Sequence, residues 1–177
     1  MRKLTHDEIL HRQKEKQAEG KVPLVVVLNN IRSLYNVGAI FRTADGAGVQ
    51  KIWITGITGH PPNNMISKTA LGAEESVNWE YNPDIFNVVK QLKKEGYEIA
   101  FLEHIESSIP YQAYSPNKPV AIILGNEIDG ISDSLLAECD QAIEIEMAGL
   151  KNSLNVSVAF GIVAYHLRNQ LLKVSAS

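Results

Sequence analysis

Cysteine is almost absent from this sequence, which has a single one, Cys139, among its 177 residues. One cysteine excludes an intramolecular disulfide and a cysteine-based metal cluster. The five histidines show no metal-ligand spacing, so we expect no metal site. Because disulfides are rare in reducing compartments, the composition favours a cytoplasmic protein.

Long apolar runs are also missing. No stretch approaches the roughly 18 apolar residues that a membrane span requires. The first 21 residues lack the apolar core of a signal peptide and contain acidic residues, which transit peptides avoid. We therefore expect no membrane partner. The apolar content of 45% is nevertheless ample for one domain with a sizeable core.

Excess positive charge is absent as well, because the net charge of the chain is -3. This value argues against a protein that coats nucleic acid indiscriminately. The charge is unevenly spread: residues 1–21 carry six basic and four acidic side chains, whereas the rest of the chain carries 11 and 16. We therefore divide the chain into a charged helical extension, 1–21, and a domain, 22–177. The extension is either a solvated helix or an RNA-facing arm, and composition does not decide between them.

Short apolar runs alternate with helical patterns after residue 21. Runs rich in Val and Ile predict buried strands at 24–28, 49–55, 97–102, 120–124 and 142–145. Helices are predicted at 36–47, 83–95, 132–138 and 153–172. This alternation predicts an α/β domain with a mostly parallel sheet. Ligands of such sheets bind beyond the carboxyl ends of the strands.

The glycine-rich loops of nucleotide-binding proteins are missing too. No G-x-G-x-x-G follows a predicted strand, and the chain has no P-loop. A nucleotide-like ligand would therefore have to be bound by other loops. Three loops that follow or precede predicted strands carry polar residues suited to this task.

The first of these loops leads into the helix NVGAIFRTADGAG, residues 36–48. Asn36 is a candidate N-cap of this helix. Arg42 lies opposite the apolar stripe and leans back over Gly38, where the side chain is missing. This vacancy near a helix start predicts an anion site, with phosphate as the expected ligand. The alternative is an ordinary surface arginine.

The second loop follows the strand at 120–124. Gly125 ends the strand, and Asn126 and Glu127 then emerge at the carboxyl edge, where ligands bind. Ser132 is a candidate cap for the next helix. An ordinary strand-turn-helix connection would also account for this pattern.

The third loop precedes the last helix, which is apolar nearly all round. Ser153 and Asn155 are expected at or inside its first turn, and N-capping explains only one of them. A helix without a polar face is buried from several directions. It is either a central core helix, or it packs one face on the sheet and another on a second subunit.

Three segments resemble the signature motifs of one family, in order and at suitable spacing. They are NNIRSLYNVGAIFRTADGAGV, VAIILGNEIDGIS and IEMAGLKNSLNVSVA. Together they resemble the SpoU (TrmH) branch of the SPOUT RNA methyltransferases, and SKTALGAEE adds a weaker fourth match. The resemblance implies a homodimer with a C-terminal deep trefoil knot. It also implies the cofactor S-adenosylmethionine and methyl transfer to a ribose 2′-hydroxyl of tRNA or rRNA.

Functional residues are implied by their positions in these motifs. Arg42 matches the essential arginine and Asn36 the asparagine that supports it. Glu127 matches the glutamate of the second motif, and Ser153 and Asn155 match the polar pair of the third. The residues implied to line the cofactor pocket are Leu102, Leu124, Gly125, Ile145, Met147 and Leu154.

The sequence departs from many relatives in two ways. Glu146 stands where many have a proline before the methionine of the third motif. The large N-terminal RNA-binding domain of longer relatives is not found in this sequence, which inclines the prediction toward tRNA. Substrate choice is then expected from segment 1–21, the loop at 60–68 and the dimer surface. The residues predicted to bind RNA are Arg2, Lys3, Arg12, Arg32, His60 and Lys68.

Three readings compete with a ribose methyltransferase. A SPOUT enzyme of this kind could methylate a base nitrogen instead. A non-catalytic module could bind RNA or S-adenosylmethionine, although the presence of Arg42, Glu127 and Asn155 argues against it. An unrelated nucleotide-binding α/β protein would have to match the motifs by chance. For Arg42, an electrostatic clamp fits its chemistry better than a general base, because arginine stays protonated in proteins.

Overall fold

The computed structural model describes residues 1–18, 20–126 and 130–174. Its strands are β1 (Val22–Asn29), β2 (Val49–Thr55), β3 (Trp79–Asn82), β4 (Glu98–Leu102), β5 (Ile109–Pro110), β6 (Val120–Leu124) and β7 (Gln141–Glu144). Its helices are α1 (His6–Ala18), α2 (Leu34–Ala47), α3 (Asn64–Ala70), α4 (Ala73–Ser76), α5 (Ile85–Lys94), α6 (Asp133–Leu136) and α7 (Val156–Val174), with a 3-10 turn η1 (Tyr111–Ala113).

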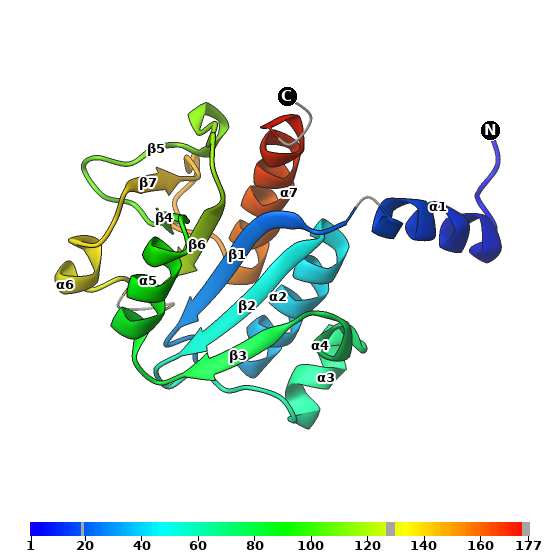
Figure 1. The fold of residues 1–177 in the computed structure, drawn as a ribbon, viewed down its shortest axis with the longest axis horizontal. Helices are drawn as coiled ribbons and strands as arrows, with labels where there is room; N and C mark the ends of the chain where they lie inside the picture. Colours follow the sequence, from blue (N-terminus) through cyan, green and yellow to red (C-terminus); the bar gives the residue numbers. More distant parts are fainter. Residues whose placement is uncertain (19, 127–129, 175–177) are drawn as a thin grey trace.

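The strands form one seven-stranded sheet in the order β3-β2-β1-β6-β4-β7-β5 (Figure 1). Every pair of neighbouring strands is parallel. The predicted α/β class and parallel sheet are therefore confirmed. The trefoil knot stays a prediction.

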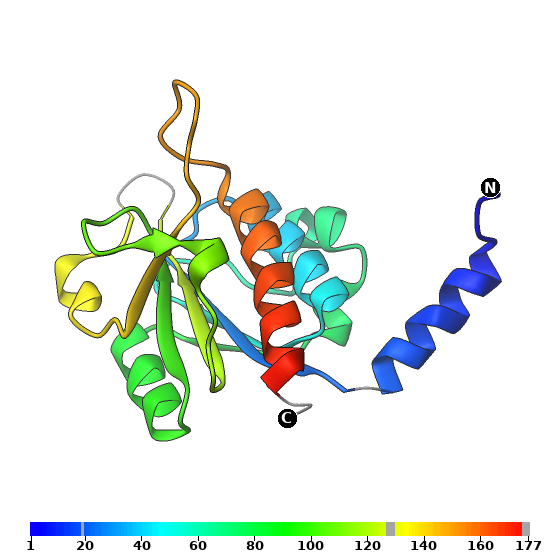
Figure 2. The ribbon, with the colours of Figure 1, turned by 90° about the horizontal axis from the view of Figure 1, so that it is seen from above.

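Helices cover both faces of the sheet, and this is why the central strands are apolar throughout. On β1, Leu24, Val26 and Leu28 pack in the cluster that contains α2, α3, α4 and α7. Val25 and Val27 point to the opposite face, where α5 and α6 pack (Figures 1 and 2). Successive side chains of a strand point to opposite faces. In a strand covered on both sides, every side chain is therefore buried, which favours apolar residues at each position.

All five predicted strands exist, but two more edge elements were not predicted. β3 has the sequence WEYN, and its two central residues are exposed. β5 is a two-residue strand at the opposite edge. Edge strands are solvated on one side, so they lack the continuous apolar run that marks a buried strand.

Helix α1 buries none of its residues and stands apart from the sheet in both views (Figures 1 and 2). Its start is held by a reciprocal capping box: Glu8 N donates to Thr5 Oγ1, and Thr5 N donates to Glu8 Oε2. Arg2 donates to the same carboxylate at 2.8 and 2.5 Å. The division into residues 1–21 and 22–177 stays a prediction.

Helix α7 begins at Val156, later than the predicted start at residue 153. Phe160, Val163 and Leu167 are completely buried against the sheet. Val158 and Tyr165, in contrast, are 52% and 49% exposed. The interpretation as a central core helix is therefore wrong, because one face of α7 is open in this chain. No helix within the described ranges has the length and apolarity to cross a membrane.

Candidate active site

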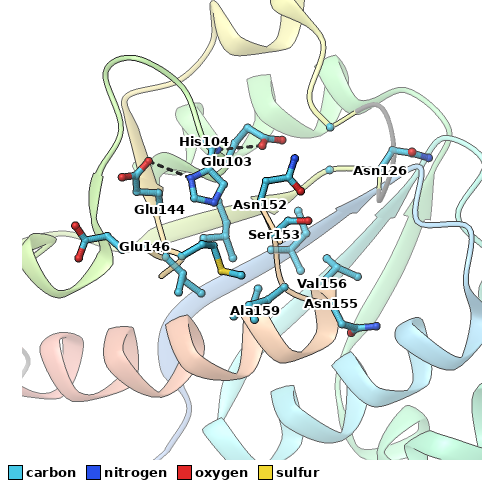
Figure 3. Close-up of a pocket in the computed structure, with 17 residues that line it drawn as sticks. Glu103, His104, Asn126, Glu144, Glu146, Asn152, Ser153, Asn155, Val156 and Ala159 are labelled. Atoms are coloured by element: carbon cyan, nitrogen blue, oxygen red, sulfur yellow. Dashed lines mark hydrogen bonds and ion pairs between the residues drawn. The ribbon is translucent and has the colours of Figure 1, made fainter. Parts of the chain in front are cut away.

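A pocket of about 1040 Å³ opens at the carboxyl ends of β4, β6 and β7 and against the start of α7 (Figure 3). The loops after these three strands and the segment before α7 supply its walls. Carboxyl ends of parallel strands lie at one edge of a sheet, so loops distant in sequence meet there. All six residues predicted to line a cofactor pocket line this one: Leu102, Leu124, Gly125, Ile145, Met147 and Leu154.

One wall of the pocket is acidic. Most of its residues were not among the site residues predicted from the sequence. Glu103 and His104 follow β4, and Glu144 and Glu146 belong to β7 and its loop (Figure 3). His104 Nδ1 lies 3.2 Å from Glu144 Oε2, and Ser108 Oγ donates to the same oxygen at 2.5 Å. The Ser108 hydrogen bond, supported by His104, lowers the pKa of Glu144. The signal in the sequence was positional: these residues lie where strands end.

The first and third motifs meet through two asparagines. Asn155 Nδ2 donates to Asn36 Oδ1 at 3.1 Å. The predicted N-cap role of Asn36 is wrong, because α2 begins at Leu34 and Ser33 Oγ accepts from Asn36 N. Capping by Ser33 leaves the Asn36 side chain available for Asn155, and Asn155 itself lines the pocket.

Asn155 also stabilises the start of α7. Its Oδ1 accepts from Ser157 N at 2.9 Å and from Ser157 Oγ at 2.6 Å. The side chain therefore caps the helix with its oxygen and holds Asn36 with its nitrogen. Ser153 precedes the helix and lines the pocket without being part of α7 (Figure 3).

The empty space predicted above Gly38 is filled by α3. A Cβ on Gly38 would lie 2.1 Å from Thr69 Oγ1 and 2.3 Å from the carbonyl oxygen of Ile66. The glycine permits two helices to approach closely, so the predicted anion site above it is wrong. Arg42 is exposed on α2 and is not among the residues that line the pocket of its own chain.

Glu127, predicted as a catalytic residue, lies outside the described residues. Its neighbour Asn126 lines the pocket on the side away from His104 and Glu144 (Figure 3). Asn126 Nδ2 donates to the carbonyl oxygen of Asn30 at 2.9 Å. The second motif is thereby tied to the segment that opens the first.

The residues predicted to bind RNA do not form one cluster with the pocket. Arg2 and Lys3 precede α1 and Arg12 lies in it, whereas Arg32 precedes α2. Lys68 belongs to α3, so the predicted loop at 60–68 is partly helical. His60 stacks on Trp79, with ring centroids 5.7 Å apart, and contacts the Tyr81 ring at a tilt, with centroids 5.0 Å apart. Within the described part of the chain, no group of three His, Cys, Asp or Glu side chains is placed to hold a metal.

Comparison with known proteins agrees with this geometry. The model of the SpoU rRNA Methylase family matches residues 23–165. The chain is 33% identical over 150 residues to a tRNA (guanosine(18)-2'-O)-methyltransferase of Thermus thermophilus, covering 85% of this chain and 76% of the relative. It is 35% identical over 155 residues to a 23S rRNA (guanosine-2'-O-)-methyltransferase of Vibrio parahaemolyticus, covering 88% of this chain but 62% of that relative.

Solved structures of RNA methyltransferases share the fold of this chain. A TrmH/SpoU tRNA modifying enzyme from A. aeolicus superimposes with a TM-score of 0.80 at 26% identity, covering 94% of this chain and 86% of that one. An AdoMet-bound rRNA methyltransferase from Sinorhizobium meliloti gives 0.78 at 27% identity, covering 84% of this chain and 56% of that one. The chain therefore belongs to the SpoU rRNA methylase family, which confirms the family and the enzyme class that its three motifs predicted.

Proposed function

We propose that this protein transfers a methyl group from S-adenosylmethionine to a ribose 2′-hydroxyl of tRNA. The observation that carries the proposal is the hydrogen bond between Asn36 and Asn155 at the mouth of the pocket. It brings the first and third motifs together beside the residues predicted to bind the cofactor. The family assignment supports the reaction class.

The pocket suits S-adenosylmethionine in shape and in charge. Its volume of about 1040 Å³ is at the upper end of the ordinary range for small-molecule sites. Leu124, Ile145 and Met147 offer apolar surface for an adenine ring. The carboxylates of Glu103 and Glu144 favour a ligand that carries positive charge. When bound there, the cofactor would supply an electrophilic methyl group on a positively charged sulfur.

The polar residues at the pocket mouth would position the ribose. A hydroxyl is a weak nucleophile, so holding it in line can supply ~7 kcal/mol or more of the barrier. The guanidinium of Arg42 has no hydrogen bond or ion pair with the residues that the structure describes, so it is available to RNA. We assign it to clamping a phosphate and stabilising negative charge on the hydroxyl oxygen, since it cannot readily accept a proton.

A homodimer through α2 and α7 forms part of the proposal. Exposed apolar side chains gather on these two helices: Leu154, Val158 and Tyr165 lie at or in α7, and Tyr35 lies in α2. A Cβ on Gly46 would lie 2.9 Å from the Tyr165 hydroxyl, so this face continues one turn beyond Arg42. A self-complementary contact here would cover the apolar face and bring Arg42 beside the second subunit.

The choice of tRNA is supported by similarity to the Thermus tRNA enzyme and to the A. aeolicus tRNA modifying enzyme. RNA contacts are proposed for segment 1–21, with Arg2, Lys3 and Arg12, and for Arg32, His60 and Lys68. Basic side chains bind phosphates and set the salt dependence of RNA affinity.

The test is methylation with labelled S-adenosylmethionine of separate tRNA and rRNA fractions from a strain that lacks the protein. We expect label in the tRNA fraction, on a 2′-O-methylated nucleoside identified by mass spectrometry. Label on a base would contradict ribose methylation, and label in rRNA alone would contradict the choice of tRNA. Cofactor binding without label in any fraction would indicate a non-catalytic module.

A further inference from the structure

Three aromatic side chains form one cluster at the edge of the sheet where β3 lies (Figure 1). The His60 ring stacks on Trp79 with an angle of 26° between the ring planes, and it contacts the Tyr81 ring at a tilt. Trp79 and Tyr81 are alternate residues of β3, so both point to the sheet face that α2 covers. His60 and Tyr81 are exposed, whereas Trp79 is half-buried. The cluster therefore presents aromatic surface to solvent.

Each ring of the cluster is anchored. Trp79 packs edge-on against the fully buried Phe41, with ring centroids 6.5 Å apart. The Tyr81 hydroxyl donates to the carbonyl oxygen of Gly56 at 3.0 Å. His60 Nδ1 donates to the carbonyl oxygen of the next residue at 2.9 Å, because a carbonyl oxygen only accepts. Side chains that are already fixed lose little conformational entropy when a ligand stacks on them.

The loop that carries His60 packs against the start of α2. A Cβ on Gly59 would lie 2.3 Å from Leu34 Cδ2, so the glycine permits this close approach. Leu34 is the first residue of α2, and Asn36 in the same turn pairs with Asn155 at the mouth of the large pocket. The aromatic cluster is therefore a neighbour of the first motif.

A cavity of about 340 Å³ connects the two regions along the carboxyl edge of the sheet. Asn126 and Gly130 line both this cavity and the large pocket, and Ile57, from the loop that carries His60, also lines it. Ile57 N donates to Asn30 Oδ1 at 3.0 Å, and the carbonyl oxygen of Asn30 accepts from Asn126 Nδ2 at 2.9 Å. This edge offers a continuous path for a nucleotide strand between the pocket and the aromatic cluster.

We propose that His60, Tyr81 and Trp79 form a stacking site for an unpaired base of the RNA substrate, in the same single-stranded stretch as the methylated nucleotide. This inference rests on the proposed function. One face of the His60 ring lies on Trp79, so the base stacks on the other, exposed face. Aromatic rings bind unpaired bases in this way whatever the base, because every base has a π-face. The site adds affinity for an unpaired stretch of RNA without selecting a particular base.

Two probes with equal numbers of phosphates separate stacking from charge. One is a short oligoadenylate, and the other is a ribose-phosphate chain of the same length without bases. At a fixed salt concentration the phosphates contribute equally to both affinities, so their ratio measures the contribution of the bases. We expect protein saturated with S-adenosylhomocysteine to bind oligoadenylate more tightly by about 5-fold or more. Equal affinities, or no binding of oligoadenylate, would overturn the proposal.

Variants of His60 assign the stacking to this cluster. His60→Ala should lower the affinity ratio by about 5-fold or more and leave binding of the chain without bases unchanged. His60→Phe keeps an aromatic ring and should retain the ratio, whereas a loss as large as that of His60→Ala would overturn stacking as the cause. Phe86→Ala is the matched control, because Phe86 is an exposed aromatic residue of α5 across the sheet. It should bind both probes as wild type does.

Tyr81 gives an independent check. Tyr81→Phe loses only the hydroxyl that binds Gly56 and should retain the ratio, whereas Tyr81→Ala removes the ring beside His60 and should lower it. Unchanged S-adenosylhomocysteine affinity shows that each variant keeps the large pocket intact. A wild-type ratio in both alanine variants of the cluster would overturn the proposal. Failure of the proposed function appears differently, as absence of methylation in every RNA fraction, while the two probes still decide the stacking site.

Discussion

Asn155 donates a hydrogen bond to Asn36 across 119 positions of sequence. This contact fixes the start of α7 against the first turn of α2, at the mouth of the large pocket. The side-chain oxygen of Asn155 also accepts hydrogen bonds from the backbone N–H and the hydroxyl of Ser157. Because both asparagines are anchored by helix starts, the pair presents a preorganised polar surface to whatever enters the pocket.

Asn36→Ala should remove this pair while leaving the Asn155 cap intact. We expect the free energy of unfolding to fall, and the Asn36–Asn155 hydrogen bond to account for about 0.5–1.5 kcal/mol of the loss. In an Asn155→Ala background the same change should cost less, because the partner is already gone. Urea unfolding of the four proteins of this cycle measures the coupling. Strictly additive losses would show that the pair contributes nothing.

Arg42→Lys should abolish most methyl transfer although it preserves the charge. A guanidinium offers a planar fork of donors that an ammonium does not, and loss of such a donor costs about 100-fold or more in rate. Because Arg42 is exposed on α2, stability and S-adenosylmethionine affinity should stay at wild-type values. Near-normal methylation of a verified RNA substrate by this variant would mean that the assignment is wrong.

Gly38→Ala should destabilise the protein by about 1–3 kcal/mol, because the added methyl group meets the backbone of α3. Gly161→Ala is the matched control, since a Cβ there would lie 3.9 Å from Thr43 Cγ2, an ordinary contact. Where the added methyl group has room, replacing a helical glycine by alanine should raise the free energy of unfolding by about 0.5–1 kcal/mol. Denaturant unfolding compares the two, and equal stability of both variants would contradict the close packing of α2 on α3.

The lowered pKa of Glu144 predicts how the stability of the protein changes at acidic pH. A carboxyl group with a lowered pKa stabilises the folded state above its unfolded pKa of about 4.3, and this stabilisation disappears as pH falls through the folded pKa. Glu144→Gln should therefore melt below wild type at pH 7, and the two melting temperatures should converge toward pH 3. Glu106→Gln, at an exposed position of the loop that contains His104 and Ser108, should follow wild type throughout. A constant difference at all pH values would count against the Ser108 and His104 contacts as its cause.

The exposed face of α7 predicts the oligomeric state. Val158→Glu places a charge in the centre of that face and should convert a dimer to a monomer in light scattering. Phe86→Glu is the control, because Phe86 is similarly exposed, at 43%, but lies on α5 across the sheet. A Val158→Glu dimer as tight as wild type would place the interface elsewhere.

The positions of the pocket residues were predictable because they depend on strand ends. Apolar runs locate buried strands, and a parallel sheet brings their carboxyl ends to one edge. Leu102, Leu124 and Ile145 lie at such strand ends, and the resemblance to the family implied that they line one pocket, which the structure confirms. The motifs supplied the rest, including the polar residues Ser153 and Asn155.

The environment of α2 could not be predicted in the same way. Periodicity placed Arg42 opposite the apolar stripe correctly, but it gave no information about α3. The space at Gly38 is filled by Thr69 and Ile66, which are separated from it by about thirty residues of chain. Likewise, Ser33 and Asn36 are both acceptable caps by residue type, and the observed helix start decided for Ser33.

The sequence by itself determined the α/β class, the family and the loops that form the pocket, because local hydrophobic pattern and motif order specify them. Tertiary structure alone decided which residues form hydrogen bonds across the chain: Asn155 with Asn36, His104 with Glu144, and the Asn126 side chain with the Asn30 carbonyl oxygen. It also decided that one face of α7 is open in this chain. Such contacts depend on distances between segments far apart in the chain, which a one-dimensional pattern does not contain.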